Sequence, residues 1–334
     1  REVLSPAPRA SMRVCVLISA SPEDSPPAAY DPEPVPERWL DGHTVRKVPL
    51  KQHEAETRLP ELIAEGFDVF LNLCDGVITE PLAGVEVTEA LEALGAPYTS
   101  SSSANYRMTR REVKTCLSDA GLPTPAWAFV YSPDDLAAAH AVPLPAIVKH
   151  HDGYGSLGMR ANAKVTDAQQ LQERALEMLR GCGGALVEEF APGAELTVLC
   201  VADAEAPGGV FVYPPFVCGF PPGEEFKHFV LKWRAFSGLT WRPDTDAARV
   251  AEATALSRAA FFALNARCGL RCDLRVDARG RLTLLDCNFD FGVFYPPGHE
   301  GCADEILLHD PEGHRGLLRR MFNLARRLSS PHIL

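Results

Sequence analysis

The sequence predicts an α/β fold, and three observations support this prediction. Over the first hundred residues, short apolar runs that suit β-strands alternate with helical stretches, as in a parallel sheet covered by helices. The chain has 334 residues, which predicts two or three subdomains rather than one small core. Its hydrophobic content of 46% and charged content of 23% are ordinary for a packed globular protein.

The N-terminal third contains the alternation most clearly. We expect a strand at residues 12–19, a Pro-rich acidic loop at 21–39 and a helix at 54–65. A second strand at 67–73 and a second helix at 85–94 follow. Pro60 is expected to break or restart the first helix, since proline removes a backbone donor. Gly95 is expected to end the second helix.

The middle third begins after the Ser-rich junction at residues 100–103. Thr109 with Glu112 three residues later forms a capping box, which predicts a helix running to Ala120. After it we expect a strand at residues 127–131, a helix at 133–141 and a strand at 146–149 that ends at a lysine. A second helix at 166–180 and a final strand at 185–190 follow.

The C-terminal part is expected to begin with a β run at 195–201 and an irregular, charged stretch at 224–241. A long Ala-rich helix at 247–265 and a basic amphipathic helix at 316–328 follow from the helical spacing of apolar residues. Between these helices lie two β segments, 270–276 and 281–288, joined by Asp-Ala-Arg-Gly, which indicates a hairpin.

Charge and composition exclude several function classes. The net charge of -11 and the isoelectric point near 5.4 argue against broad contact with nucleic acid or with an anionic membrane. No apolar run approaches the ~20 residues that a membrane-spanning helix needs. Residues 1–11 are interpreted as an extension or tag, with Met12 as the natural start.

The ten cysteines are irregularly spaced and mostly flanked by apolar residues. Cys268, Cys272 and Cys287 could be taken for a zinc cluster, but no paired C-x2-C or H-x3-H set accompanies them, so buried free thiols are favoured. This pattern favours a reducing, cytoplasmic location, with an organellar one left open.

The hairpin carries the most specific chemical signal. Because side chains on a strand alternate faces, Arg271 and Asp273 share one face, and Asp286 and Asn288 share one face of the next strand. If the two faces lie side by side, two carboxylates and a carboxamide converge, and a cation such as Mg²⁺ would neutralise them. The alternative from the residues alone is an Arg271–Asp273 salt bridge with Asp286 and Asn288 at a solvated strand end.

Two further segments point to phosphate and nucleotide. The strand that ends at Lys149 precedes a loop with glycines at 153, 155 and 158, whose backbone could approach phosphate oxygens. The segment at 188–195, Glu-Glu-Phe-Ala-Pro-Gly-Ala-Glu, could offer backbone groups to an adenine edge and a carboxylate to a ribose. Each has a plain alternative, a flexible turn for the loop and an acidic surface turn for the segment.

The chain resembles the ATP-grasp superfamily, in the D-alanine–D-alanine ligase-like branch. The resemblance rests on four features that occur in the order typical of that family: Lys114, Lys149 with its glycine loop, the segment 188–195 and the hairpin. The resemblance spans residues 69 to 298. It implies a three-subdomain ATP-grasp fold, α+β in the ATP-grasp part, with a Rossmann-like N-terminal domain. The implied parts are an N-terminal domain at residues 12–104, a small lid subdomain at 105–190 and a C-terminal subdomain with the magnesium site at 191–330.

The resemblance also implies a role for each matching residue. Arg271 would stabilise the acyl phosphate and the tetrahedral intermediate. Asp273, Asp286 and Asn288 would hold one or two Mg²⁺ ions, for which Mn²⁺ could substitute. The residues implied to bind ATP are Lys114, Lys149, Gly153, Tyr154, Gly155, Ser156, Gly158, Glu188, Glu189, Ala191, Glu195 and Lys232. Lys227 lies close enough to Lys232 to compete for the phosphate contact.

The implied reaction joins a small-molecule carboxylate to an amine, such as an amino acid or specialised metabolite, through an acyl phosphate, with release of ADP and phosphate. Where D-alanine–D-alanine ligases have a glycine-rich segment, a histidine turn and a Pro-Gly turn, this chain has residues 19–24, 73–76 and 289–293. These differences favour another amine acceptor. A true D-alanine–D-alanine ligase and a catalytically silent ATP-binding module stay open as alternatives, as does a homodimer.

Overall fold

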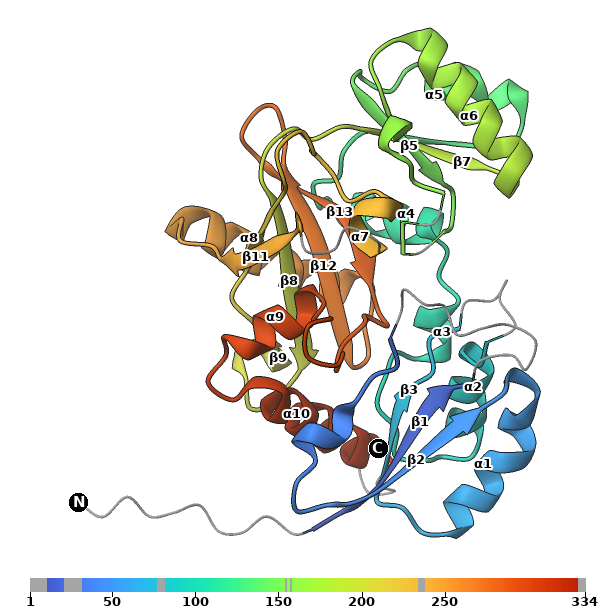
Figure 1. Cartoon of the computed structure of the whole chain (residues 1–334), viewed down its shortest axis with the longest axis vertical. Coiled ribbons are helices and arrows are strands. Elements are labelled where there is room, and N and C mark those ends of the chain that lie inside the picture. Colours follow the sequence, from blue (N-terminus) through green and yellow to red (C-terminus); the bar gives the residue numbers. More distant parts are fainter. Residues whose placement is uncertain are drawn as a thin grey trace.

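The computed structural model describes residues 11–20, 32–76, 82–153, 155–156, 158–233 and 238–329. Three β-sheets follow one another along the long axis of the molecule (Figure 1). The N-terminal sheet lies at one end, the largest sheet in the middle and a four-stranded sheet at the other end. Helices and sheets occur together throughout, so the predicted α/β fold is confirmed.

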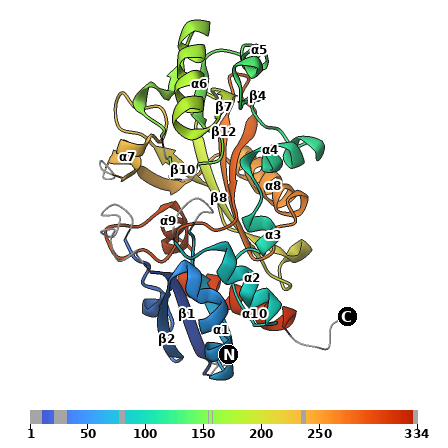
Figure 2. The ribbon, with the colours of Figure 1, turned by 90° about the vertical axis from the view of Figure 1, so that its right-hand side faces the viewer.

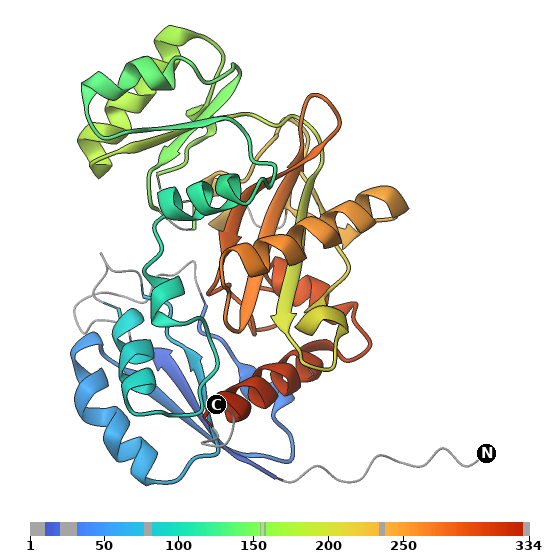
Figure 3. The ribbon, with the colours of Figure 1, turned by 180° about the vertical axis from the view of Figure 1, so that it is seen from behind.

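The N-terminal sheet is parallel, with the strand order β2 (Thr44–Leu50), β1 (Arg13–Ser19), β3 (Val69–Leu73). Alternate residues of β1 face opposite ways: Cys15 and Leu17 pack toward α1 (Ala55–Ala64) and α2 (Val85–Ala93), while Val14 and Val16 pack toward α10 (Gly313–Leu328). The C-terminal helix therefore closes the far face of the first sheet, as Figure 3 shows from behind.

Two details of the N-terminal part, one in a helix and one in the sheet, differ from what the sequence predicts. Pro60 lies inside α1, which is not interrupted. Strand β2 was not predicted, because its sequence TVRKVPL lies at the sheet edge and only Val48 and Leu50 are buried.

The four-stranded sheet is antiparallel, in the order β4 (Trp127–Val130), β7 (Ala185–Glu189), β5 (Ala146–His150), β6 (Lys164–Val165). Helices α5 (Leu136–Ala139) and α6 (Ala168–Cys182) pack on it around a core of small and branched side chains. Short α3 (Ser103–Tyr106) and α4 (Arg110–Asp119) connect it to the N-terminal part. The capping box of Thr109 and Glu112 at the start of α4 is confirmed.

The central sheet runs in the order β11 (Thr240–Pro243), β10 (Phe216–Gly219), β8 (Glu195–Ala202), β12 (Gly269–Val276), β13 (Leu282–Asn288), and β9 (Val210–Val212) also pairs with β8. Helix α8 (Ala247–Ala263) covers one face, while α7 (Phe229–Trp233) and α9 (Cys302–Leu308) lie on the other side (Figure 2). The predicted hairpin is β12–β13. The boundaries of the three predicted subdomains stay a prediction.

The loop between β13 and α9 is held by a buried carboxylate. Asp304 accepts hydrogen bonds from the backbone N–H of Phe294 and pairs with Nε2 of His314, both at 2.8 Å. The imidazole of His314 stacks on Trp39 with ring centroids 3.9 Å apart. These contacts join the loop to two other parts of the chain. None of the described helices is long and apolar enough to cross a membrane.

We expect Asp304→Ala to lower the free energy of unfolding by about 3 kcal/mol, because it leaves buried donors without an acceptor. Urea unfolding monitored by tryptophan fluorescence would measure the change. The control Glu305→Ala removes a half-buried carboxylate from the neighbouring position of α9 and should cost less than about 1 kcal/mol. Equal effects of the two substitutions would show that Asp304 does not anchor the loop.

Candidate active site

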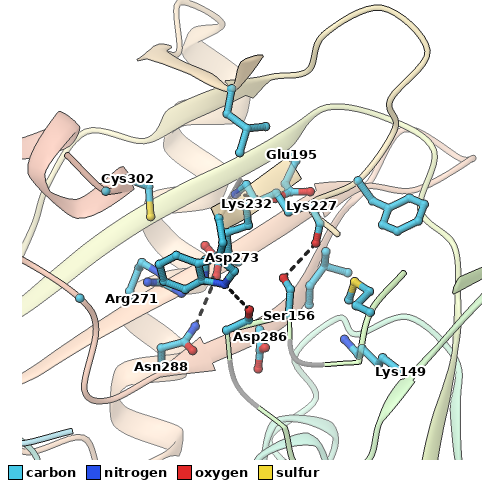
Figure 4. Close-up of a pocket in the computed structure, with 18 of the residues that line it drawn as sticks. Lys149, Ser156, Glu195, Lys227, Lys232, Arg271, Asp273, Asp286, Asn288 and Cys302 are labelled. Carbon is cyan, nitrogen blue, oxygen red and sulfur yellow. Dashed lines mark hydrogen bonds and ion pairs between the residues drawn. The ribbon is translucent and has the colours of Figure 1, made fainter. Parts of the chain in front are cut away.

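A cavity of about 560 Å³ lies between the four-stranded sheet and the central sheet, and most of the predicted site residues line it (Figure 4). The predicted residues on its wall are Lys149, Gly153, Gly155, Ser156, Glu188, Glu189, Ala191, Glu195, Lys232, Arg271, Asp273, Asp286 and Asn288. Lys114 and Gly158 are not on the wall. Tyr154 lies outside the described residues.

The hairpin brings its polar faces together as the alternation of side chains predicts. In the register, Arg271 lies opposite Asn288 and Asp273 lies opposite Asp286. Asp273 accepts hydrogen bonds from Arg271 Nη2 at 3.1 Å, from Asn288 Nδ2 at 3.3 Å and from Thr197 Oγ1 at 3.0 Å. The Arg271–Asp273 salt bridge and the convergence of carboxylates, which the sequence presented as alternatives, are therefore both present.

A β-bulge marks the strand beside Asp286. The register shifts after Asp273, so that Leu274 pairs with Leu284 and Leu285 has no opposite residue. The carbonyl oxygen of Leu285 accepts a hydrogen bond from Lys114 Nζ at 3.1 Å. Lys114 therefore supports the strand that carries Asp286 instead of lining the cavity.

Arg110, in the first turn of α4, is a site residue that the sequence analysis missed. Its Nη2 pairs with Asp286 at 2.9 Å and its Nη1 donates to the carbonyl oxygen of His150 at 3.2 Å. Burial opposes the ionisation of Asp286, but Arg110 and Lys149 outweigh it and lower its pKa to about 2. The signal in the sequence was the spacing of four between Arg110 and Lys114, which places both on one helix face.

Glu188 lies at the centre of a buried ion-pair cluster. It pairs with Lys114 and, at 2.8 Å, with Lys149; its own exposed fraction is 3%. Burial alone would raise the pKa of Glu188, but the two ammonium groups outweigh it and the net shift is downward. Burial lowers the pKa of Lys149. The carboxylate predicted to meet adenine thus also orients the lysine predicted to meet phosphate.

Two lysines face the cavity from the segment before β11. Lys227 Nζ pairs with Glu195 at 2.7 Å, and this carboxylate outweighs burial and raises the pKa of Lys227. Burial, together with Arg271, lowers the pKa of Lys232 to about 8. Both lysines line the cavity, so the choice between them for the phosphate contact stays open.

The glycine loop is tied to the opposite wall. Ser156 Oγ donates to the carbonyl oxygen of Lys227 at 3.0 Å, and Trp233 Nε1 donates to that of Gly155 at 2.7 Å. Gly155 and Gly158 have φ values of 60° and 70°, which favour glycine. At Gly153, a Cβ atom would lie 2.7 Å from the His150 ring. Gly155 and Ser156 therefore link this part of the cavity wall to Lys227 and Trp233.

The oxygen donors present suit a magnesium ion. Asp273, Asp286 and Asn288 offer carboxylate and carboxamide oxygens, the ligand type that Mg²⁺ takes together with phosphate oxygens and water. Among the described residues, no third His, Cys, Asp or Glu side chain joins Asp273 and Asp286 as a metal ligand, so the third protein ligand would be the carboxamide oxygen of Asn288. Cys272 and Cys287 lie on the opposite face of the hairpin, buried, with their sulfur atoms 3.9 Å apart.

Comparisons with known proteins found relatives that cover about two thirds of the chain. The uncharacterized protein y4sG of Sinorhizobium fredii is 30% identical over 243 residues, covering 69% of this chain and 67% of its own. The D-alanine–D-alanine ligase of Xanthomonas axonopodis pv. citri is 29% identical over 234 residues, covering 68% and 70%. No family model matches the chain.

Solved structures agree in fold over nearly the whole chain. A D-alanine–D-alanine ligase from Bacillus anthracis, complexed with ATP, superposes with a TM-score of 0.64 at 17% identity and covers 96% of this chain and 99% of its own. A D-alanyl-alanine synthetase A from Vibrio cholerae gives 0.68 at 14% identity, covering 95% and 99%. The chain belongs to the ATP-grasp superfamily, in the D-alanine–D-alanine ligase-like branch.

We expect Glu188→Gln to destabilise the protein by about 3–5 kcal/mol at pH 7, because it leaves two buried ammonium groups without their shared carboxylate. The pKa of Glu188 is depressed in the folded state, so its stabilising effect is present above the unfolded value near 4.5 and is lost as the pH falls below it. The difference in urea-unfolding free energy from wild type should therefore shrink below pH 4.5. A difference independent of pH would contradict the ion-pair assignment.

Proposed function

We propose that this protein joins a small-molecule carboxylate to an amine through an acyl phosphate and releases ADP and phosphate. The broader class, an ATP-dependent C–N ligase of the ATP-grasp type, follows from the family to which the chain belongs. The observation that carries the proposal is the side-by-side placement of Arg271, Asp273, Asp286 and Asn288 on one wall of the cavity, opposite Lys149.

The first chemical step is the attack of a carboxylate oxygen of the substrate on the γ-phosphorus of ATP. One P–O bond forms, the bond to the ADP oxygen breaks, and ADP takes the electron pair. Mg²⁺ held by Asp273, Asp286 and Asn288 would neutralise charge on the phosphates. Lys149 is oriented by Glu188 and contributes positive charge from the opposite wall.

In the second step the lone pair of the amine nitrogen attacks the acyl carbon. The C–N bond forms, the C–O bond to phosphate breaks, phosphate takes that electron pair, and the nitrogen loses one proton to phosphate or solvent. Negative charge develops on the carbonyl oxygen in the tetrahedral intermediate. Arg271, whose guanidinium is already aligned by Asp273, is the residue we assign to stabilise this charge.

The described parts of the segments that differ from D-alanine–D-alanine ligases line a neighbouring cavity, which contains Ser19, Leu73, Cys74 and the loop 289–293, while residues 21–24 lie outside the described residues. This placement supports a substrate other than a second D-alanine. Production of D-alanyl-D-alanine from D-alanine and ATP would establish the alternative of a true D-alanine–D-alanine ligase.

The test is incubation with ATP, Mg²⁺ and pools of carboxylates and amines, with separation of the nucleotide products. We expect substrate-dependent ADP and phosphate. AMP and pyrophosphate would contradict the acyl-phosphate mechanism, and ATP binding without turnover would indicate a silent binding module.

With any active substrate pair, we expect Asp273→Asn to lower kcat at least about 100-fold, because it removes charge from the magnesium site. The control is Asp277→Asn, at the turn of the same hairpin. The carboxylate of Asp277 pairs with Arg281 and does not line the cavity. Its kcat should stay within about twofold. Full turnover by Asp273→Asn would refute the metal assignment.

A further inference from the structure

A second cavity of about 250 Å³ adjoins the first, and the two share Pro32, Gly292 and Tyr295 in their walls. Its floor is formed by the carboxyl ends of β1 and β3 with the loop that follows β13. The chain passes from one cavity to the other directly after β13, since Asn288 lines the first cavity and Asp290 lines the second.

Asp290 is a partly buried carboxylate on this wall. It accepts hydrogen bonds from Ser101, from the backbone N–H at 3.3 Å and from the hydroxyl Oγ. Both donors are neutral, and no ion pair links Asp290 to a basic side chain among the described residues. An ionised carboxylate in this position lacks a counter-charge, which a cationic ligand would supply.

The rest of the wall is apolar, neutral polar or acidic, the neutral polar residues including Ser19, Asn72 and Ser100. Apolar side chains include Ile18, Leu73, Phe291, Val293 and Met321, and the acidic ones are Glu33, Asp75 and Asp290. Among the described residues, no lysine, arginine or histidine lines this cavity. The segments 21–31 and 77–81, which adjoin wall residues in the sequence, contain no basic residue either.

We propose that the second cavity binds the amine substrate, that Asp290 accepts hydrogen bonds from its ammonium group, and that this substrate carries no free carboxylate beside its nitrogen. The inference rests on the proposed ligase function and names its acceptor class: aliphatic primary amines and amino acid amides rather than free α-amino acids. A free α-carboxylate would be buried against Asp290 and Phe291 with no cation to pair with it.

Matched pairs of acceptors test whether a free carboxylate beside the nitrogen weakens the use of an amine. Leucinamide and leucine, or alaninamide and alanine, differ only in that the carboxylate is replaced by a neutral amide. Each is supplied with ATP, Mg²⁺ and a pool of carboxylic acids; ADP release is measured, and mass spectrometry identifies which compound provided the nitrogen. We expect kcat/KM for the amide to exceed that for the free amino acid at least about tenfold.

Equal or better use of the free amino acid as the nitrogen donor would overturn this inference while leaving the ligase function intact. No ADP release with any donor and acceptor would overturn the proposed function, and the acceptor class with it. These two failures are therefore distinguishable.

A variant tests the residue itself. Asp290→Asn keeps the shape and removes the charge, so KM for the amine should rise at least about tenfold while KM for ATP stays within about twofold. The control Asp134→Asn makes the same change at an exposed position of the four-stranded part, away from both cavities. An unchanged amine KM in Asp290→Asn would overturn the assignment. If that variant does not fold, as judged by its thermal melt, the matched acceptor pairs decide.

Discussion

The antiparallel register of β12 and β13 is the constraint on which the site depends. It places Asp273 opposite Asp286 and Arg271 opposite Asn288, so that carboxylates, amide and guanidinium share one face. A slip of one residue would turn these side chains to the other face, where Cys272 and Cys287 now pack in the core. The β-bulge after Asp273 and its hydrogen bond from Lys114 fix this register beside Asp286.

Around this hairpin, charges from three parts of the chain balance one another. Arg110 from α4 pairs with Asp286, and Lys114 from the same helix pairs with Glu188 of β7. Glu188 in turn orients Lys149 of β5. Because Lys114, Lys149 and Glu188 are buried, and Arg110 and Asp286 partly buried, each depends on its partner more than an exposed group would. The same ion pairs thus hold the four-stranded sheet against the central sheet and supply the charge of the cavity wall.

Sequence reasoning recovered elements whose signals are local. The capping box at Thr109, the hairpin turn and the alternation of β1 each depend on neighbouring residues. The position of Lys114 could not be read in this way, because its partners Leu285 and Glu188 are far along the chain. Edge strand β2 was missed because its pairing with β1 and the burial of its side chains are set by tertiary packing.

The central claim is that the cavity joins a carboxylate to an amine through an acyl phosphate, and isotope transfer tests it most directly. A substrate carboxylate labelled with ¹⁸O in both oxygens would be turned over with ATP and an amine, and the released phosphate analysed by mass spectrometry. Our account predicts one ¹⁸O atom in each phosphate, because the attacking oxygen leaves with phosphorus. Amide formation with ADP and unlabelled phosphate would contradict it.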